Sequence, residues 1–216
     1  MSFISKVELK KQLQEMGFKV EGNYVRKIEQ VLAEKVTTLT VFRGVKDIWA
    51  KNLPEERKSE GFWGIGTYYA LDIPTAEDYI KYGASASGDM KEWGFVAEFI
   101  FTGVVKKLTP EQPSDTEWEK GFVDLPKKYP KNTVFLLIQG DNYNPPEGGE
   151  QLLITPKSKY KAILKRFWVY FVKDKNAKYF ASVFKKANED NKVGPFSLSE
   201  IKKVDTTLQN IKNLTK

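Results

Sequence analysis

The chain has 216 residues, of which 41% are hydrophobic and 13% aromatic, enough to bury a core and too many for a disordered segment. It contains no Cys and no His, which excludes disulfide frameworks, thiolate zinc sites, cysteine nucleophiles and Ser-His-Asp triads. The net charge of +7 is uneven, because residues 157–216 carry 15 basic against 5 acidic side chains. Such a basic tail favours an acidic partner such as nucleic acid, although a lysine-rich surface also serves solubility alone.

Targeting signals are not evident in the sequence. No run of about eighteen apolar residues is present, so we expect no membrane span. Residues 1–8 lack the apolar core and the small-residue cleavage site of a signal peptide. We therefore expect a cytoplasmic protein, or one delivered into a target cell by a signal-independent route.

The first third of the chain alternates between helical and extended patterns. Apolar residues at helical spacing predict short amphipathic helices over 5–17 and 24–35. Residues 36–44 are rich in β-branched side chains and predict a strand that delivers Arg43 at its end. Residues 46–60 are polar and charged, which favours a loop or a short helix.

A stretch of glycines and aromatic residues, Gly61-Phe62-Trp63-Gly64-Ile65-Gly66-Thr67-Tyr68-Tyr69-Ala70, follows. Glycine allows close backbone approach, and tyrosine offers a ring to stack on and a hydroxyl that fixes orientation. The stretch is therefore predicted to be a turn that could hold a planar ring, although such clusters more often form turns in the core. It leads into a predicted helix over 74–82 that contains Tyr79.

The rest of the chain contains several strands and then helices. Ser197-Leu198-Ser199-Glu200 has the spacing of a capping box before a terminal amphipathic helix. This order indicates an α+β fold rather than an alternating β-α-β fold, and no GxGxxG or phosphate-binding loop is present. The further predicted elements are strands over 94–107, 133–139 and 150–154, a strand pair or one long strand over 159–172, and a helix over 174–188.

Three features occur in a fixed order along the chain: Arg43-Gly44 on a strand, the aromatic stretch at 64–70, and Glu150 at the start of a later strand. Taken singly, the arginine would be a salt-bridge partner and the glutamate a solvated edge residue. As an ordered set, over roughly residues 38–171, they resemble the ADP-ribosyltransferases, the superfamily of mono-ADP-ribosylating toxins and poly-ADP-ribose polymerases. Val41-Phe42-Arg43-Gly44 is similar to the toxin branch, and Gly64-Ile65-Gly66-Thr67-Tyr68-Tyr69-Ala70 to the polymerase branch.

The resemblance implies NAD as substrate and no metal. It implies that Glu150 orients the ribose and stabilises an oxocarbenium-like state, with Arg43 and Tyr68 completing a mixed Arg-Tyr-Glu catalytic set. Arg43 would pair with the NAD diphosphate through its planar donor fork. The other residues that it implies for NAD binding, through the backbone or by stacking on nicotinamide, are Gly44, Gly66, Thr67, Tyr68 and Tyr79.

The resemblance leaves the acceptor open. Protein-modifying toxins commonly have Gln or Glu two residues before the catalytic glutamate, where this chain has Gly148, with Glu147 one residue further away. Tyr143 is placed like the aromatic residue with which the family recognises its acceptor. Both a protein and RNA or DNA are therefore expected candidates. Nucleic acid would be bound electrostatically by the tail residues Lys185, Lys186, Lys202 and Lys203.

The implied architecture is a single domain over 1–216 with a core of two packed, mostly antiparallel sheets and helices at both termini. N-terminal helices would occupy 1–35, the catalytic core 36–172, and a basic helical extension 173–216. Lone catalytic domains of this family are often bacterial or phage toxins or effectors, which adds an immunity or antitoxin protein as a candidate partner. Two alternatives remain open: an NAD glycohydrolase toxin, and an inactive module that binds nucleic acid or a partner protein.

Overall fold

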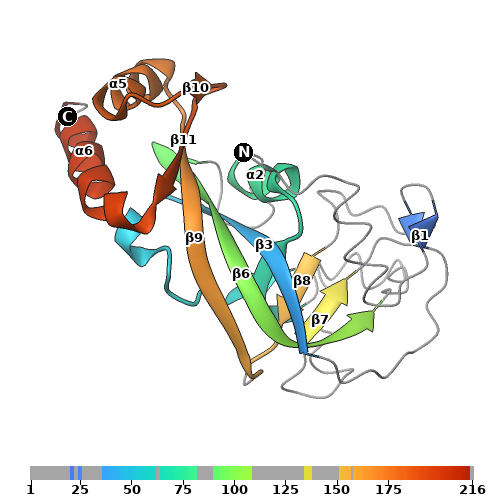
Figure 1. Cartoon of the computed structure of the whole chain (residues 1–216). Coiled ribbons are helices and arrows are strands. Elements are labelled where there is room, and N and C mark those ends of the chain that lie inside the picture. The colour runs from blue at the N-terminus through green and yellow to red at the C-terminus, as the bar shows by residue number, and fades with distance from the viewer. Residues whose placement is uncertain are drawn as a thin grey trace. The chain divides into compact units, whose positions relative to one another are not determined.

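The computed structural model describes residues 20–21, 24–25, 36–61, 64–81, 90–108, 134–137, 151–156 and 158–214. It divides into two compact units, each assembled from separated parts of the chain. The first unit comprises Met1–Val41, Glu56–Thr75 and Ile100–Ala162, and the second comprises Phe42–Glu55, Ala76–Phe99 and Ile163–Lys216. Strands β3 (Val36–Lys46), β6 (Trp93–Leu108) and β9 (Tyr160–Phe171) contribute residues to both units (Figure 1).

In the first unit, the strand order runs from β3 through β5 and β8 to β7, and β4 pairs with the first residues of β5, Gly64–Gly66. Strand β5 (Gly64–Ala70) is antiparallel to β4 (Ser59–Gly61) and to β8 (Gln151–Ile154). Strand β7 (Val134–Leu137) is antiparallel to β8 and parallel to β6. All four residues of β8 are buried, which is typical of a strand covered on both faces.

In the second unit, the strand order is β10, β11, β9, β6 and β3. Strands β10 (Asn188–Glu189) and β11 (Lys192–Ser197) form a hairpin whose two connecting residues, Asp190 and Asn191, have φ of 50° and 63°. Positive φ at both central residues defines a turn whose twist matches the strands, and Asp and Asn tolerate it well. Helix α5 (Asp174–Phe184) contacts β11.

An aromatic cluster forms the core of the second unit. Phe180 of α5 lies 5.0 Å from Phe171 and 5.7 Å from Phe196, measured between ring centroids, and Phe167 lies 5.6 Å from Phe196. Stacked, tilted and edge-on ring pairs at these separations add to the hydrophobic gain of burial, which is about 2 kcal/mol or more for each ring. This packing joins α5 and β11 to β9.

Residues 197–214 form the terminal helical segment. The predicted capping box is confirmed, because Glu200 accepts hydrogen bonds from the backbone N–H and the hydroxyl of Ser197. A short 3-10 helix η2 (Leu198–Glu200) then continues into α6 (Ile201–Leu214). The buried positions Val204, Leu208 and Ile211 recur at helical spacing and hold α6 against the rest of the second unit.

Most predicted elements of the described chain are confirmed, including α2 (Ile73–Lys81) and the strands β3, β6, β7, β8 and β9. The region 46–60 contains the short 3-10 helix η1 (Ala50–Asn52) and β4. The α+β class is confirmed, whereas two packed sheets are not confirmed by the strands that the structure describes. The division into one domain with terminal extensions stays a prediction.

Other predictions are wrong in detail. Tyr24–Val25, predicted as helical, is strand β2, paired with β1 (Val20–Glu21). The residues between them, Gly22 and Asn23, are types that hairpin loops favour, a signal that the helical spacing concealed. The helix predicted over 5–17 and the rest of 24–35 lie outside the described residues. The helix predicted to reach residue 188 ends at Phe184, and the β10–β11 hairpin follows it.

Candidate functional site

The glycine-aromatic stretch is a strand rather than the predicted turn. Residues Gly64–Ala70 form β5, and pairing with both β4 and β8 supplies the hydrogen bonds that hold it extended. At Gly66, an added Cβ would lie 2.7 Å from the carbonyl oxygen of Ile154 and would overlap the Leu153 side chain. The glycine therefore permits close approach of β8 to β5.

The register between β5 and β8 brings two of the sequence motifs together. Tyr68 is opposite Leu153 and Ala70 is opposite Gln151. Gln151 is the residue that directly follows Glu150 in the sequence. Gln151, the first described residue of the strand predicted to start at Glu150, thus pairs with Ala70, the last residue of the Tyr68-Tyr69-Ala70 segment. Glu150 itself, together with Tyr143, Glu147 and Gly148, lies outside the described residues.

Thr67 is part of a polar cluster in the first unit, which we call the Tyr160 cluster and define as Glu56, Thr67 and Tyr160. Thr67 is fully buried, and its hydroxyl donates to Oε1 of Glu56 over 3.3 Å. The Tyr160 ring stacks on Phe101 with 5.9 Å between centroids. Burial, and then the neighbouring Tyr69 and Glu56, raise the pKa of the Tyr160 hydroxyl, while a hydrogen bond with Thr67 opposes them.

The Tyr160 cluster was not found from the sequence. Glu56 and Tyr160 come from parts of the chain that only the fold brings together, and neither has a local pattern that marks it. The Glu56 carboxylate is exposed although it bonds a buried hydroxyl. The cluster therefore presents a solvent-accessible carboxylate, that of Glu56, near Tyr69 of β5, a group suited to accepting hydrogen bonds from hydroxyl-bearing ligands.

Arg43 lies in the second unit, inside β3 rather than at its end. Its guanidinium is 5% exposed. One terminal nitrogen donates to the Glu55 carbonyl over 3.0 Å, the other donates to the Leu53 carbonyl, and the group lies 4.9 Å from the Phe99 ring centroid. These contacts satisfy a buried charge with main-chain oxygens and an aromatic face. Arg43 therefore holds the segment after η1 against its own strand.

Gly44 and Tyr79 also belong to the second unit, and the structure brings them together. A Cβ on Gly44 would overlap the carbonyl oxygen of Ala76 and would lie 3.1 Å from Cβ of Tyr79. The glycine thus allows the backbone of β3 to pack directly against α2. Among the predicted NAD residues, Arg43, Gly44 and Tyr79 fall in the second unit, and Gly66, Thr67 and Tyr68 in the first. Their roles toward NAD stay predictions.

A second tyrosine-carboxylate group lies in the second unit, which we call the Tyr170 cluster and define as Glu77, Tyr170 and Lys192. The Tyr170 hydroxyl donates to Oε1 of Glu77 over 2.5 Å, and Nζ of Lys192 lies 3.4 Å from the same oxygen. Tyr170 is 3% exposed. Burial, and then the hydrogen bond and charge of Glu77, raise the pKa of the Tyr170 hydroxyl. The cluster ties α2 to β9 and β11.

The four tail lysines differ in their surroundings. Lys186 donates to the Pro195 carbonyl over 2.5 Å and lies 3.3 Å from Oε1 of Glu200, and Nζ of Lys203 lies 4.6 Å from the Phe184 ring centroid. These two lysines therefore have internal contacts that support the fold. Lys185 and Lys202 are exposed.

Comparison with known proteins assigns no family to the chain. No protein-family model matches it, and no curated protein or solved structure matches it either. Within the described residues, no helix is long and apolar enough to cross a membrane. The same part of the chain shows no group of three or more acidic side chains that could hold a metal ion.

Proposed function

We propose that the protein is a mono-ADP-ribosyltransferase that transfers ADP-ribose from NAD to a macromolecular acceptor. The observation that carries this proposal is the pairing of β5 with β8, in which Ala70 is opposite Gln151. Two motifs that resemble the same family, and that are far apart in the sequence, are neighbours in this pairing. A chance resemblance of two unrelated segments would not require them to be adjacent strands.

The proposed chemistry uses only residue types that the chain possesses. Cleavage of the bond between nicotinamide and ribose develops positive charge on the sugar, which the Glu150 carboxylate would stabilise while it orients the ribose hydroxyl. Tyr68 and Tyr79 would bracket the nicotinamide ring, with Gly44 binding its amide through the backbone. Arg43 would contribute positive charge toward the diphosphate. We also propose that the complete fold has the family's core of two packed sheets, with helices at both termini.

The Tyr160 cluster adds support from the described residues. Thr67, which the resemblance assigns to NAD binding, is fully buried and bonded to the exposed Glu56 carboxylate. A ribose presents hydroxyls that a carboxylate accepts well, so Glu56 is suited to a hydroxyl of the nucleotide. The biological setting that we propose is a bacterial or phage toxin or effector, with an immunity or antitoxin protein as a partner.

The test is incubation of the protein with adenine-labelled NAD and whole-cell lysate, followed by separate treatment with RNase, DNase and protease. We expect label on a macromolecule, removal of that label by one treatment, and loss of labelling in the Glu150→Ala chain. The matched control is Glu189→Ala, which removes an exposed carboxylate on β10 and should label normally.

Other results would redirect the proposal. Nicotinamide release that depends on Glu150 but leaves no label on macromolecules would identify an NAD glycohydrolase. No nicotinamide release from either the unaltered chain or the control would contradict NAD chemistry altogether.

A further inference from the structure

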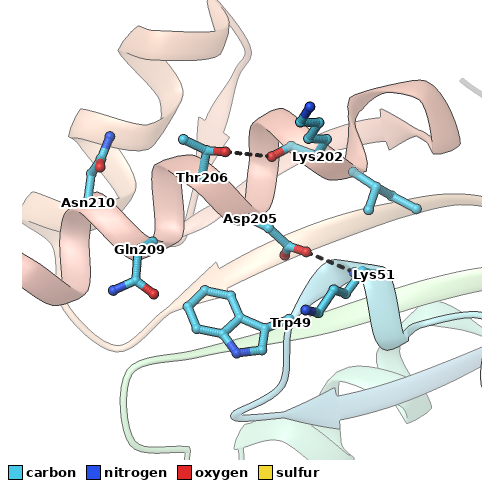
Figure 2. A pocket seen from close by; sticks show the side chains of 8 residues that line it. Trp49, Lys51, Lys202, Asp205, Thr206, Gln209 and Asn210 are labelled. Carbon is cyan, nitrogen blue, oxygen red and sulfur yellow. Dashed lines mark hydrogen bonds between the residues drawn. The ribbon is translucent and has the colours of Figure 1, made fainter.

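A groove in the second unit lies between η1 and α6 and has a volume of about 580 Å³ (Figure 2). This volume is in the range of small-ligand sites, and it is enough for a nucleotide unit. The groove shares no residue with the predicted NAD site. Its lining consists of Trp49, Lys51, Ile201, Lys202, Asp205, Thr206, Gln209 and Asn210.

Trp49 forms an aromatic wall that is already held in place. Its ring centroid lies 5.4 Å from that of Trp93 at an interplanar angle of 50°. Trp93 is itself anchored, because its indole N–H donates to the Ile48 carbonyl over 2.7 Å. Figure 2 shows the Trp49 ring beside Gln209 of α6. A ring fixed before a ligand arrives loses little side-chain entropy on binding.

The charges of the groove favour an anionic ligand. Of the titratable residues that line it, Lys51 and Lys202 are exposed cations and Asp205 is the acidic one. Both carboxylate oxygens of Asp205 are engaged, because they accept the backbone N–H groups of Ala50 and Lys51 over 2.6 Å and 3.1 Å. The Asp205 charge thus serves the fold, while the lysines face solvent.

We propose that this groove binds single-stranded nucleic acid. A base would stack on Trp49 in place of Lys212, whose Nζ lies 5.9 Å from the ring centroid, and the neighbouring phosphates would bind Lys51 and Lys202. The exposed Asn210 amide would pair with a base edge, and so would Gln209 after giving up its hydrogen bond from Nε2 to Oδ1 of Asn213. Bases in a duplex are already stacked and cannot reach the indole ring, so a single strand is the form that fits. The proposal goes beyond NAD chemistry and holds whether or not the chain turns over NAD.

The experiment measures fluorescence anisotropy of short labelled single-stranded RNA, single-stranded DNA and their duplexes with the full chain, without NAD, over a series of salt concentrations. We expect both single strands to bind more tightly than the duplexes. Lys51→Gln with Lys202→Gln should lower the slope of log affinity against log salt by about 1.4, because each phosphate contact contributes about 0.7 for a single strand. Lys165→Gln with Lys175→Gln, which removes two exposed charges outside the groove, should leave that slope nearly unchanged.

Stacking is tested separately. Trp49→Leu should weaken single-strand binding about tenfold or more, whereas Trp49→Phe should retain part of the affinity. Because Trp49 packs on Trp93, Gln209→Ala with Asn210→Ala provides a second variant that leaves this contact intact and should also weaken binding. Circular dichroism verifies that each variant is folded.

Four results would overturn the proposal. They are equal losses in the control and groove lysine variants, duplexes that bind as tightly as single strands, displacement of the probe by polyglutamate as readily as by a single strand, and no binding at low salt. Duplexes that bind as tightly as single strands would show that charge alone directs binding. Displacement by polyglutamate would show the same and would indicate an acidic protein segment as the ligand.

Discussion

The Tyr160 and Tyr170 clusters are built from the same chemical parts but differ in their access to solvent. In each, a tyrosine of β9 lies beside a glutamate, and the pKa of the hydroxyl is raised. In the Tyr170 cluster the glutamate side chain is 16% exposed and is shared with Lys192. In the Tyr160 cluster Glu56 is exposed, and its carboxylate accepts a hydrogen bond from the buried Thr67 hydroxyl.

This difference separates a polar group that holds the fold together from one that can meet a ligand. A buried hydroxyl bonded to a half-buried ion pair stabilises the native state, and removal of one member is costly because the others lose their partner. Substitution of the exposed Glu56 should cost less, because water replaces its solvent-facing contacts and only the buried Thr67 hydroxyl loses an acceptor. The first kind should therefore affect stability, and the second should affect binding.

The largest expected effect is on Glu77. Glu77→Ala removes the acceptor shared by the Tyr170 hydroxyl and the Lys192 ammonium, so we expect unfolding free energy to fall by about 3 kcal/mol. Urea denaturation followed by circular dichroism measures it. Glu56→Ala is the matched control and should cost less than about 1 kcal/mol. Equal losses in the two variants would remove the distinction between the clusters.

Removal of the tyrosine hydroxyl should lower mainly stability in the Tyr170 cluster and mainly activity in the Tyr160 cluster. Tyr170→Phe should lower unfolding free energy by about 1.5 kcal/mol and leave NAD turnover near its original value. Tyr160→Phe should cost less in stability but lower kcat/KM for nicotinamide release by about tenfold, if Thr67 contacts NAD as we propose. Denaturation measurements and nicotinamide-release assays on the same two variants would measure both effects. A stable Tyr160→Phe chain with full activity would place the Tyr160 cluster outside the NAD site.

Alkaline pH provides a third comparison. The raised pKa of each tyrosine means that the folded state keeps its proton where the unfolded chain, with a pKa near 10.0, releases it. The contribution to stability is therefore complete below pH 10 and is lost as the pH rises, at up to about 1.4 kcal/mol per pH unit for Tyr170. Stability measured between pH 9 and 11.5 should fall less steeply in Tyr170→Phe and in Tyr160→Phe than in the unaltered chain, and by the same amount in both, because each hydroxyl keeps its proton in the folded state over this window. A Tyr170→Phe chain that keeps the original slope would show that the Tyr170 hydroxyl ionises in the folded protein.

The smallest effect concerns Glu200, whose contribution to stability changes with pH in the opposite direction, because its pKa is lowered and not raised. Burial raises its pKa, but hydrogen bonds from Ser197 and the nearby Lys186 outweigh burial and lower the pKa below 4.5. Its stabilisation is therefore present above pH 4.5 and disappears as the pH falls through the lowered value. Glu200→Gln should cost about 1 kcal/mol at pH 7 and progressively less as the pH falls below 4.5. A loss that is independent of pH would show that the charge of Glu200 contributes nothing.

Local patterns predicted those elements whose structure depends on their own residues. Alternating apolar side chains indicated β6, helical spacing indicated α6, and Ser197 with Glu200 marked the start of the terminal helix. The stretch at 64–70 was predicted as a turn because its glycines suggested one, whereas pairing with the remote β8 makes it a strand. The β10–β11 hairpin had a signal in Asp190-Asn191 that was overlooked, because the segment is short and charged.

The candidate site was predictable only in part. The order of Arg43, Tyr68 and Glu150 along the chain could be read directly, and so could the two glycines beside Arg43 and Tyr68. What the glycines contact could not be inferred: Gly44 admits α2, and Gly66 admits β8. Glu56 and Tyr160 were missed because their proximity depends on strand pairing between distant segments, for which a single sequence gives no spacing rule.

The bond between Asp205 and the 50–51 backbone bears on how the protein is made. Asp205 lies near the C-terminus, and the amides that it accepts belong to the first quarter of the chain. The early segment leaves the ribosome long before α6 has been synthesised, so the second unit can close only after α6 has emerged. Until then the early segment lacks its native partner, and a prematurely terminated chain would be exposed to proteolysis rather than left as an active fragment.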